Sequence, residues 1–218
     1  MIHFGIVVKE GKYGLKLTRD NYAIVNKRSS FRVKFSVDIY DDEEGKTYKD
    51  EWCKKHLTDC MKNFELNITY FNFLDKNQFD SEIIRFLSKN SMFIRVDDLS
   101  LYSGVSGYYI MILDNYCQLY VGTTGDIKTR IRNHWTNMKP FDRLFFPMGA
   151  VDTSLLSIDS FRAFDTTRIY AYITNFTYSE EDSYINQFSP KFVCNRMGGG
   201  KITGGLLQAI GMMKYRKL

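Results

Sequence analysis

The sequence predicts an α+β fold, because segments with strand spacing and segments that favour helices both occur along its 218 residues. Residues 31–40 alternate strictly between apolar and polar side chains, which is typical of a half-buried strand. After the turn sequence DDEEG, residues 47–64 favour a helix. Further along, two short apolar runs flank the sequence DNYCQ, residues 114–118, and predict a β-hairpin.

The rest of the first half predicts one more helix and one more strand. The helix covers about Asp80 to Lys89. Its inward-facing side chains are expected to be Ile83, Ile84, Phe86 and Leu87. Residues 92–96 favour a strand, and the polar segment 97–107, which contains two glycines, is the best candidate for a domain boundary. We therefore expect an N-terminal α+β domain over residues 1–100 and a second domain over residues 101–218.

The second half alternates helices and strands after the hairpin. A helix is expected from about Thr124 to Met138, followed by a long connection over residues 139–163. Residues 166–174 then favour a strand and residues 179–188 a helix. The C-terminal sequence GLLQAIGMMKYRKL favours a short helix with a basic end.

Composition and charge are typical of a soluble globular protein. Hydrophobic residues make up 44% of the chain and charged residues 25%, which argues against disorder. The net charge of +5 favours a polyanionic partner such as a nucleic acid. Because no run is long enough to cross a bilayer and no secretory signal is visible, we expect a cytoplasmic protein with no membrane partner. Its free thiols would be Cys53, Cys60, Cys117 and Cys194.

The helix after the hairpin carries a cation and a histidine at the edge of its apolar face. On a helical wheel, Ile127, Ile131 and Trp135 form a buried stripe. Arg130 and His134 fall together at the edge of this stripe, where the helix meets the surface on which it packs. The preceding hairpin is the obvious candidate for that surface.

A cation at such an edge needs an anion or a phenol nearby, since an unpaired buried charge is costly. Each of the two apolar runs of the hairpin contains a tyrosine close to a glycine. We therefore expect Tyr109, Tyr120, Arg130 and His134 to surround one site.

At these residues the sequence resembles the GIY-YIG nuclease family, over roughly residues 105–200. Gly107-Tyr108-Tyr109 corresponds to the first motif of the family and Tyr120-Val121-Gly122 to the second. Arg130 has the family's usual offset after the second tyrosine, and His134 matches a position that is histidine in several members.

The third landmark of that family is a glutamate on a later helix, followed by an apolar pair, a proline and an asparagine. The matching series here is Glu181, Tyr184-Ile185, Pro190 and Asn195. Glu180 and Asp182 flank Glu181, so the carboxylate could lie one position away. Through this resemblance Asn195 joins the candidate catalytic residues.

The resemblance implies a small central antiparallel sheet flanked by helices, and metal-dependent hydrolysis of DNA phosphodiesters. Glu181 would be the ligand of one Mg²⁺ or Mn²⁺, and Arg130 would clamp a phosphate oxygen. Tyr109 would be the general base or would position the attacking water; as a base it would need a lowered pKa. His134 would accept or relay its proton, and Tyr120 would orient the water or the phosphate.

Each of these residues also has an ordinary structural interpretation. The tyrosines could be strand aromatics in a core, and Arg130 a solvated helix cation. His134 could be a half-buried histidine, and Glu181 could be favoured in the first turn of a helix by the helix dipole.

Two further features do not predict sites. Cys53, His56 and Cys60 lie on one expected helix, with the cysteines about 10.5 Å apart, which is too far to share a zinc ion. The sequence GGGKIT, residues 198–203, lacks the glycine spacing and the Ser or Thr of a phosphate-binding loop.

The leading hypothesis is therefore a DNA endonuclease with Mg²⁺ or Mn²⁺ as cofactor, of the kind used in restriction, phage defence, phages or mobile elements. Residues 1–100 would supply target recognition, homo-oligomerisation or docking of a protein partner. Two alternatives stay open: a catalytically silent nucleic-acid-binding or interaction module on the same scaffold, and a nuclease directed at RNA.

Overall fold

The computed structural model describes residues 1–32, 35, 37–145, 148–175 and 180–195. This part of the chain is a mixed α+β structure, so the predicted α+β class is confirmed. The helices are α1 (Arg19–Tyr22), α2 (Asp50–Asn72), α3 (Lys76–Lys89), α4 (Ile127–Thr136) and α5 (Glu181–Ile185). The strands are β1 (Ile2–His3), β2 (Ile6–Val7), β3 (Ile94–Arg95), β4 (Gly107–Leu113), β5 (Gln118–Thr124) and β6 (Arg168–Ile173).

The larger sheet has four strands in the order β3-β6-β4-β5, and every neighbouring pair is antiparallel. The predicted hairpin is confirmed: β4 and β5 pair along their whole length, from Gly107 with Thr124 to Leu113 with Gln118. A 3₁₀ turn over Asp114–Tyr116 and a left-handed Cys117 (φ 47°) connect them. Every residue of β4 is buried, which makes this strand the centre of the fold.

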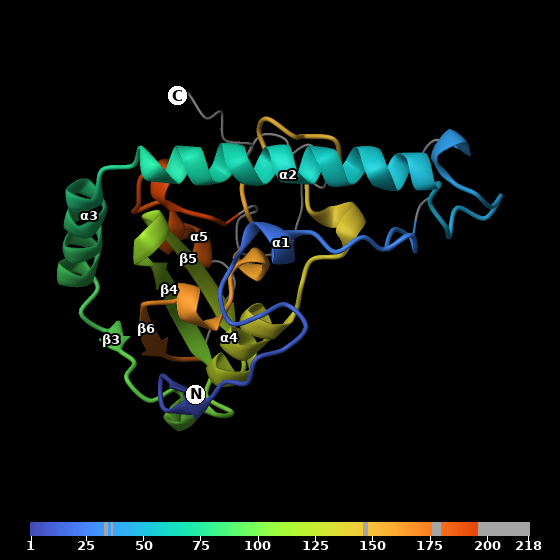
Figure 1. The fold of residues 1–218 in the computed structure, drawn as a ribbon. Coiled ribbons are helices and arrows are strands. Elements are labelled where there is room, and N and C mark those ends of the chain that lie inside the picture. The colour runs from blue at the N-terminus through green and yellow to red at the C-terminus, as the bar shows by residue number, and fades with distance from the viewer. Residues whose placement is uncertain (33–34, 36, 146–147, 176–179, 196–218) are drawn as a thin grey trace.

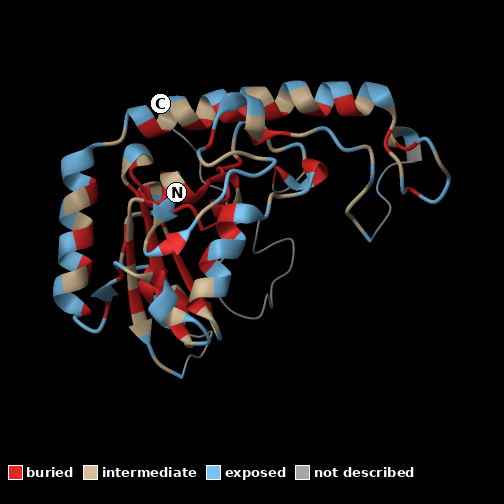
Figure 2. Ribbon diagram, turned by 60° about the horizontal axis from the view of Figure 1, so that its bottom comes forward, coloured by how far each residue is buried: buried red, intermediate tan, exposed pale blue. Residues whose placement is uncertain are grey.

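Helices cover both faces of this sheet (Figure 1). The alternation of β4 divides its side chains between two cores, because successive residues of a strand point to opposite faces. Tyr109, Met111 and Leu113 pack in one core with α2 and α4. Tyr108 and Ile110 pack in the other, with α3 and α5. Figure 2 shows the central strands as buried and the outer face of α3 as exposed.

Helix α2 runs from Asp50 to Asn72 and is longer than the predicted segment 47–64. It lies across the top of the molecule in Figure 1. Two acidic residues in its first turn favour its N-terminus through the helix dipole. Its buried side chains recur at spacings of three and four, as expected for one face of a helix: Cys53, His56, Cys60, Asn63, Phe64, Asn67 and Phe71.

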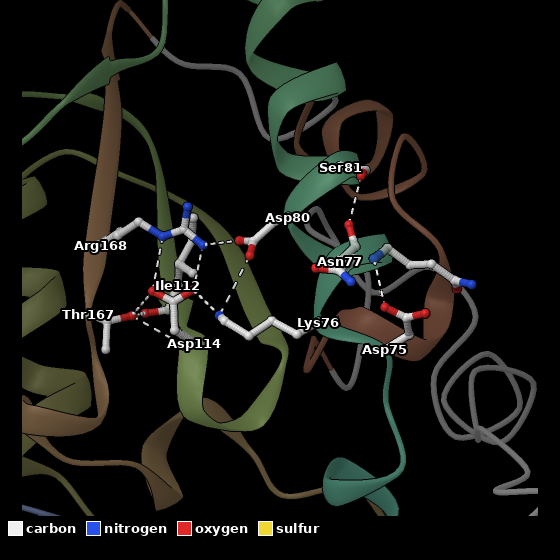
Figure 3. A network of polar contacts seen from close by, with 10 residues as sticks. Asp75, Lys76, Asn77, Asp80, Ser81, Ile112, Asp114, Thr167 and Arg168 are labelled. Carbon is white, nitrogen blue, oxygen red and sulfur yellow. Dashed lines mark hydrogen bonds and ion pairs between the residues drawn. The ribbon is translucent and has the colours of Figure 1, made fainter.

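A network of ion pairs fastens α3 to the sheet (Figure 3). Arg168 on β6 donates from Nε to Oδ2 of Asp114 (3.0 Å) and from Nη2 to Oδ1 of Asp80 on α3 (2.8 Å). Lys76, in the first turn of α3, lies 3.5 Å from Asp114 and 3.7 Å from Asp80. Two cations and two carboxylates therefore balance one another where the helix meets the strands.

Some predicted elements are wrong or differ in extent. The strand at 31–40 is wrong for the residues described, since Val37–Ile39 is a 3₁₀ turn and Phe35 is 43% exposed. Ile84, expected to face inward, is 68% exposed. The strand predicted at 92–96 is confirmed only as β3, and both of its residues are exposed. The C-terminal helix and the sequence GGGKIT lie outside the described residues.

The two halves of the chain share one sheet. Strand β3 comes from the first 100 residues and pairs with β6 through Ile94 with Ala171 and Arg95 with Tyr170. Both cores also combine side chains from the two sides of residue 100. The division into domains at this position stays a prediction. Over the described ranges, no helix combines the length and apolar character that crossing a membrane requires.

Candidate active site

Tyr109 lies at the centre of the candidate site, on the face of β4 that packs against α4. Its partner in the register of the sheet is Gly122 on β5. A Cβ atom at Gly122 would come within 2.5 Å of Cζ of Tyr109 and closer still to its Oη. The glycine of the second motif is therefore required because the tyrosine of the first motif occupies the space above it.

Glycine is required in the first motif for a different reason. Gly107 has φ of 152°, and a Cβ there would overlap the backbone of Tyr172 on β6. Only glycine allows β4 to begin this close to β6. The two motif glycines thus set the spacing of three adjacent strands around Tyr109.

A chain of hydrogen bonds leads from Tyr109 to a carboxylate. The Oη of Tyr109 lies 2.8 Å from Nε2 of His134, and Nδ1 of His134 lies 2.7 Å from Oδ1 of Asp159. An ionised carboxylate can only accept a hydrogen bond, so Nδ1 of a neutral imidazole carries the proton. Its Nε2 then has a free lone pair, and the Tyr109 hydroxyl donates to it. Each group is thereby oriented by the next, as in the nucleophile–base–acid arrangement of hydrolases.

Burial and neighbouring charges set the protonation states along this chain. Burial raises the pKa of Tyr109 well above its ordinary value, although Arg130 opposes the shift. Burial also lowers the pKa of His134, against the influence of Asp159. Burial would raise the pKa of Asp159, but the hydrogen bond with His134 and the charge of Lys139 lower it overall. At neutral pH the chain is therefore a neutral phenol, a neutral imidazole and a carboxylate.

Tyr120 and Arg130 lie beside this chain. The ring of Tyr120 lies edge-on to that of His134, with 5.0 Å between centroids, and 6.1 Å from the ring of Tyr109. Although partial burial opposes its charge, the pKa of Arg130 is raised by electrostatic interaction with the two tyrosines. Arg130 is exposed at the surface while His134 is only 3% exposed. Helix α4 therefore carries an exposed cation and, one turn later, a buried base.

Of the three neighbouring carboxylates, Glu181 is the one turned into the protein. It is 6% exposed, whereas Glu180 is exposed and Asp182 is intermediate. Burial, followed by the charge of Asp182, raises the pKa of Glu181 to about 7, while Arg130 and a backbone hydrogen bond from Thr123 act in the opposite direction. The charge of Glu181 in turn raises the pKa of both Tyr109 and Tyr120. The structure thus brings Glu181 together with the tyrosines and Arg130.

Asn195 has a different position from the other candidates. Its Oδ1 accepts from the backbone N of Val121 (3.0 Å), and its Nδ2 donates to the backbone O of Val121 (2.7 Å). Next to it, the N of Cys194 donates to the O of Leu119 (2.9 Å). These contacts hold the segment 193–195 along the edge of β5. Asn195 therefore positions the strand of the second motif, and its described contacts are with backbone atoms.

Asp159 is the residue that sequence reasoning missed. It lies in a 3₁₀ turn, Ile158–Ser160, inside the long connection 139–163, and 25 positions from His134. A single aspartate in a segment without periodicity gives no sign of its partner. Its second oxygen, Oδ2, lies 3.4 Å from Nζ of Lys139, which completes the charge balance behind His134.

Cys53, His56 and Cys60, which were considered above as zinc ligands, lie on the buried face of α2. Cys53 and Cys60 are buried free thiols, and Nε2 of His56 lies 2.8 Å from the backbone O of Phe141. All four cysteines of the chain are free, as expected. Within the described part of the chain, no group of three or more His, Cys, Asp and Glu side chains could hold a metal ion.

The donor set at the candidate site fits a hard divalent cation that keeps most of its water. Glu181 offers oxygen ligands, and Mg²⁺ is commonly held by only one or two carboxylates together with water and substrate phosphates. A buried carboxylate with a pKa of about 7 gains from a nearby positive charge when it ionises. Glu181 is the residue that would hold such an ion.

The chain matches no family model, and no curated protein sequence or solved structure is similar to it. Its function therefore has to be argued from the geometry of the site itself.

Proposed function

We propose that the chain is a metal-dependent endonuclease that hydrolyses DNA phosphodiester bonds. The observation that carries the proposal is the hydrogen-bonded series Tyr109–His134–Asp159 beside the cation Arg130 and the buried carboxylate Glu181. These groups come from one strand, two helices and a connecting loop, and together they provide a proton acceptor, an anion clamp and a metal ligand. The resemblance of the motifs to the GIY-YIG nucleases supports the same reaction.

Tyr109 is a poor base alone, because burial raises its pKa. In the proposed reaction its Oη takes a proton from the attacking water while its own proton passes to Nε2 of His134. Asp159 stabilises the imidazolium that forms. The water oxygen bonds to phosphorus, the bond from phosphorus to the leaving oxygen breaks, and solvent protonates the leaving group.

Arg130 stabilises the negative charge that develops on the phosphate, since a guanidinium can bind two of its oxygens. Tyr120, at the edge of the His134 ring, helps to orient the water or the phosphate. A divalent cation held by Glu181 would add further stabilisation of phosphate charge when bound. Asn195 acts by fixing strand β5 and has no chemical step.

Cleavage of supercoiled plasmid DNA with Mg²⁺ or Mn²⁺ tests this proposal. We expect Tyr109→Phe to slow cleavage by a factor of about 10² to 10⁴, the usual contribution of an acid or base group. Glu181→Gln should abolish cleavage, because it removes the proposed metal ligand. Two matched controls are Glu180→Gln, an exposed neighbouring carboxylate, and Tyr108→Phe, on the opposite face of β4. Both controls should cleave within a few-fold of the wild-type rate.

Two outcomes would contradict the assignment. A Glu181→Gln variant that cuts at the wild-type rate would show that Glu181 is not the metal ligand. Binding without cutting by the wild type, on modified, unmodified and branched DNA and on RNA, would favour the catalytically silent module. Cutting of RNA in preference to DNA would keep the site and change the substrate. A role in restriction or phage defence is part of the proposal and depends on which DNA is cut.

A further inference from the structure

The first 32 residues carry a charge equal to that of the whole chain. They hold seven Lys or Arg against two Asp or Glu, a difference of five, and the other residues hold 23 of each class (30 minus 7, and 25 minus 2). Residues 1–100 together hold 17 Lys or Arg against 16 Asp or Glu, so their near-neutral charge hides a basic segment. This segment packs on α4, where the rings of His3 and Phe4 lie 5.6 Å and 6.4 Å from that of Trp135.

Two adjoining cavities lie between this basic segment and α4 with the residues after it. The first, of about 510 Å³, lies between residues 6–15 and the C-terminal half of α4. The second, of about 680 Å³, lies between residues 24–30 and residues 138–141. Lys12 and Tyr13 line both cavities, so the two spaces meet at these side chains.

The charged side chains that line the cavities are all cationic. Lys9, Lys12 and Arg132 line the first cavity, and Lys12, Arg28 and Lys139 line the second. No Asp or Glu of the described residues lines either one. Only Lys139 of this set forms an ion pair within the described part of the chain, with Asp159. The positive charge here is therefore available to an external anion.

A buried arginine adds to this charge behind the shared wall. Arg162 is 1% exposed, and its Cζ lies 5.4 Å from the ring centroid of Tyr13. Its Nη1 donates to the backbone oxygens of Asp159 (2.9 Å) and Phe161 (3.0 Å), but its Nε and Nη2 have no hydrogen-bond partner among the described residues. The neighbouring carboxylates of Asp165 and Asp159 offset part of the cost of burying this guanidinium. Its two unpaired nitrogens leave hydrogen-bonding capacity behind Tyr13.

We infer that the two cavities form a groove that binds a strand of nucleic acid next to the bond that is cut; this inference rests on the proposed nuclease function. The phosphates of the strand lie against Lys9, Lys12, Arg28 and Arg132, and the ring of Tyr13 offers a face on which a base can stack. The cations lie along two cavities beside an aromatic ring, so a narrow flexible polyanion can place its phosphates at the cations and its bases in the cavities. The flat surface of a membrane could not enter the cavities.

Helix α4 connects this groove to the active site. Arg130, on the side of the tyrosines, and Arg132, at the first cavity, are both exposed. Residues two positions apart on a helix point about 200° apart, so these arginines lie on the two flanks of the exposed face of α4. A strand that crosses this face from one flank to the other would contact both. The basic N-terminal segment would thus supply substrate binding, one of the roles open to the first half of the chain.

Equilibrium binding of labelled DNA in EDTA separates this groove from catalysis. The test variant is Lys12→Gln with Arg132→Gln, and the matched control is Lys89→Gln with Arg95→Gln, which removes the same charge from α3 and β3. The affinity falls with salt, and each lost phosphate contact makes the slope of log K against log salt shallower by about 0.7 for single strands. For the test variant we expect a slope shallower by about 1.4 and roughly tenfold weaker binding. The control should bind within twofold of the wild type.

The outcomes distinguish the groove from the nuclease proposal. A test variant that binds DNA like the wild type overturns the groove, whatever the cleavage assay shows. Binding that depends on Lys12 and Arg132 in a protein that cuts no substrate supports the groove and refutes the nuclease. Absence of nucleic-acid binding by the wild type, or binding of phosphatidylserine vesicles in its place, overturns the groove. Thermal unfolding of both variants shows whether each one is folded.

Discussion

Replacing Gly122 with alanine tests the close approach that holds the two motif strands together. The new Cβ would lie 2.5 Å from Cζ and 2.9 Å from Cε1 of Tyr109, where ordinary contacts begin at 3.4 Å. Tyr109 would have to move by about 0.9 Å, and its side chain is completely buried. A shift of that size either compresses or breaks the 2.8 Å hydrogen bond with His134. Overpacking costs about 1–3 kcal/mol and the lost hydrogen bond about 1 kcal/mol.

We therefore expect Gly122→Ala to lower the free energy of unfolding by about 2–4 kcal/mol, measured by urea denaturation. Gly11→Ala is the control, because a Cβ at Gly11 meets no atom within 4 Å and its backbone is in an ordinary region. That change should be neutral or stabilise by about 0.4–1 kcal/mol, since it restricts the unfolded chain. A loss below about 0.5 kcal/mol for Gly122→Ala would show that Tyr109 does not lie over this glycine.

Two further predictions concern the chemistry. Asp159→Asn should slow single-turnover cleavage by about 10² to 10⁴, because an amide no longer holds His134 in the tautomer that accepts the Tyr109 proton. Lys139→Gln should change the cleavage rate only a few-fold, and equal effects of the two substitutions would contradict this role of Asp159. The apparent affinity for Mg²⁺ should fall about tenfold per unit of pH below about 7, because a proton competes for Glu181, whose pKa is raised to about 7. Titrating Mg²⁺ in the cleavage assay near pH 6 and pH 8 measures this, and an unchanged affinity would exclude Glu181 as the ligand.

The parts of the fold that the sequence predicted are those where local pattern and tertiary packing agree. The hairpin and α4 have apolar faces that match their burial, so their periodicity was sufficient. Residues 31–40 have an equally clear alternation, but alternation indicates a strand only where a partner strand is available. The described residues of this segment contribute no strand to the four-stranded sheet, and Tyr40 instead stacks on Tyr48 at 5.0 Å.

The same reasoning explains what could be predicted of the candidate site. Arg130 and His134 could be predicted because they lie on one helix, at the edge of the apolar stripe that packs on the sheet. Asp159 was not, since its contact with His134 depends on how a connection without periodicity crosses the end of α4. The choice between Glu180 and Glu181 also needed the structure, because only the orientation of α5 decides which side chain is buried. The role of Asn195 depends on its pairing with Val121 on β5.

Glu181 also gives a test that does not depend on any substrate. Its pKa rises from 4.5 to about 7, a difference equivalent to about 3 kcal/mol. In the unfolded chain the carboxyl ionises near its ordinary pKa, while the folded protein keeps the proton until about pH 7, so the free energy of unfolding falls between these values as pH rises. Glu181→Gln should therefore stabilise the protein by up to about 3 kcal/mol at pH 8 and have little effect near pH 4.5.

A carboxylate that is kept because it stabilises the fold should respond in the opposite way when it is replaced by an amide. Asp165 is also buried, and burial raises the pKa of its carboxyl as well. Its oxygens, however, accept hydrogen bonds from the backbone N of Leu17 (2.8 Å), the backbone N of Arg162 (2.8 Å) and the hydroxyl of Tyr116 (2.9 Å). Asp165→Asn should destabilise, because the amide places a donor against donors. Glu181 has one such hydrogen bond, from the backbone of Thr123, and burial outweighs its effect on the pKa, so the fold gains less from the charge of Glu181. If urea denaturation at pH 8 shows that Glu181→Gln is destabilised like Asp165→Asn, the Glu181 carboxylate stabilises the fold, and its burial no longer supports a role as metal ligand.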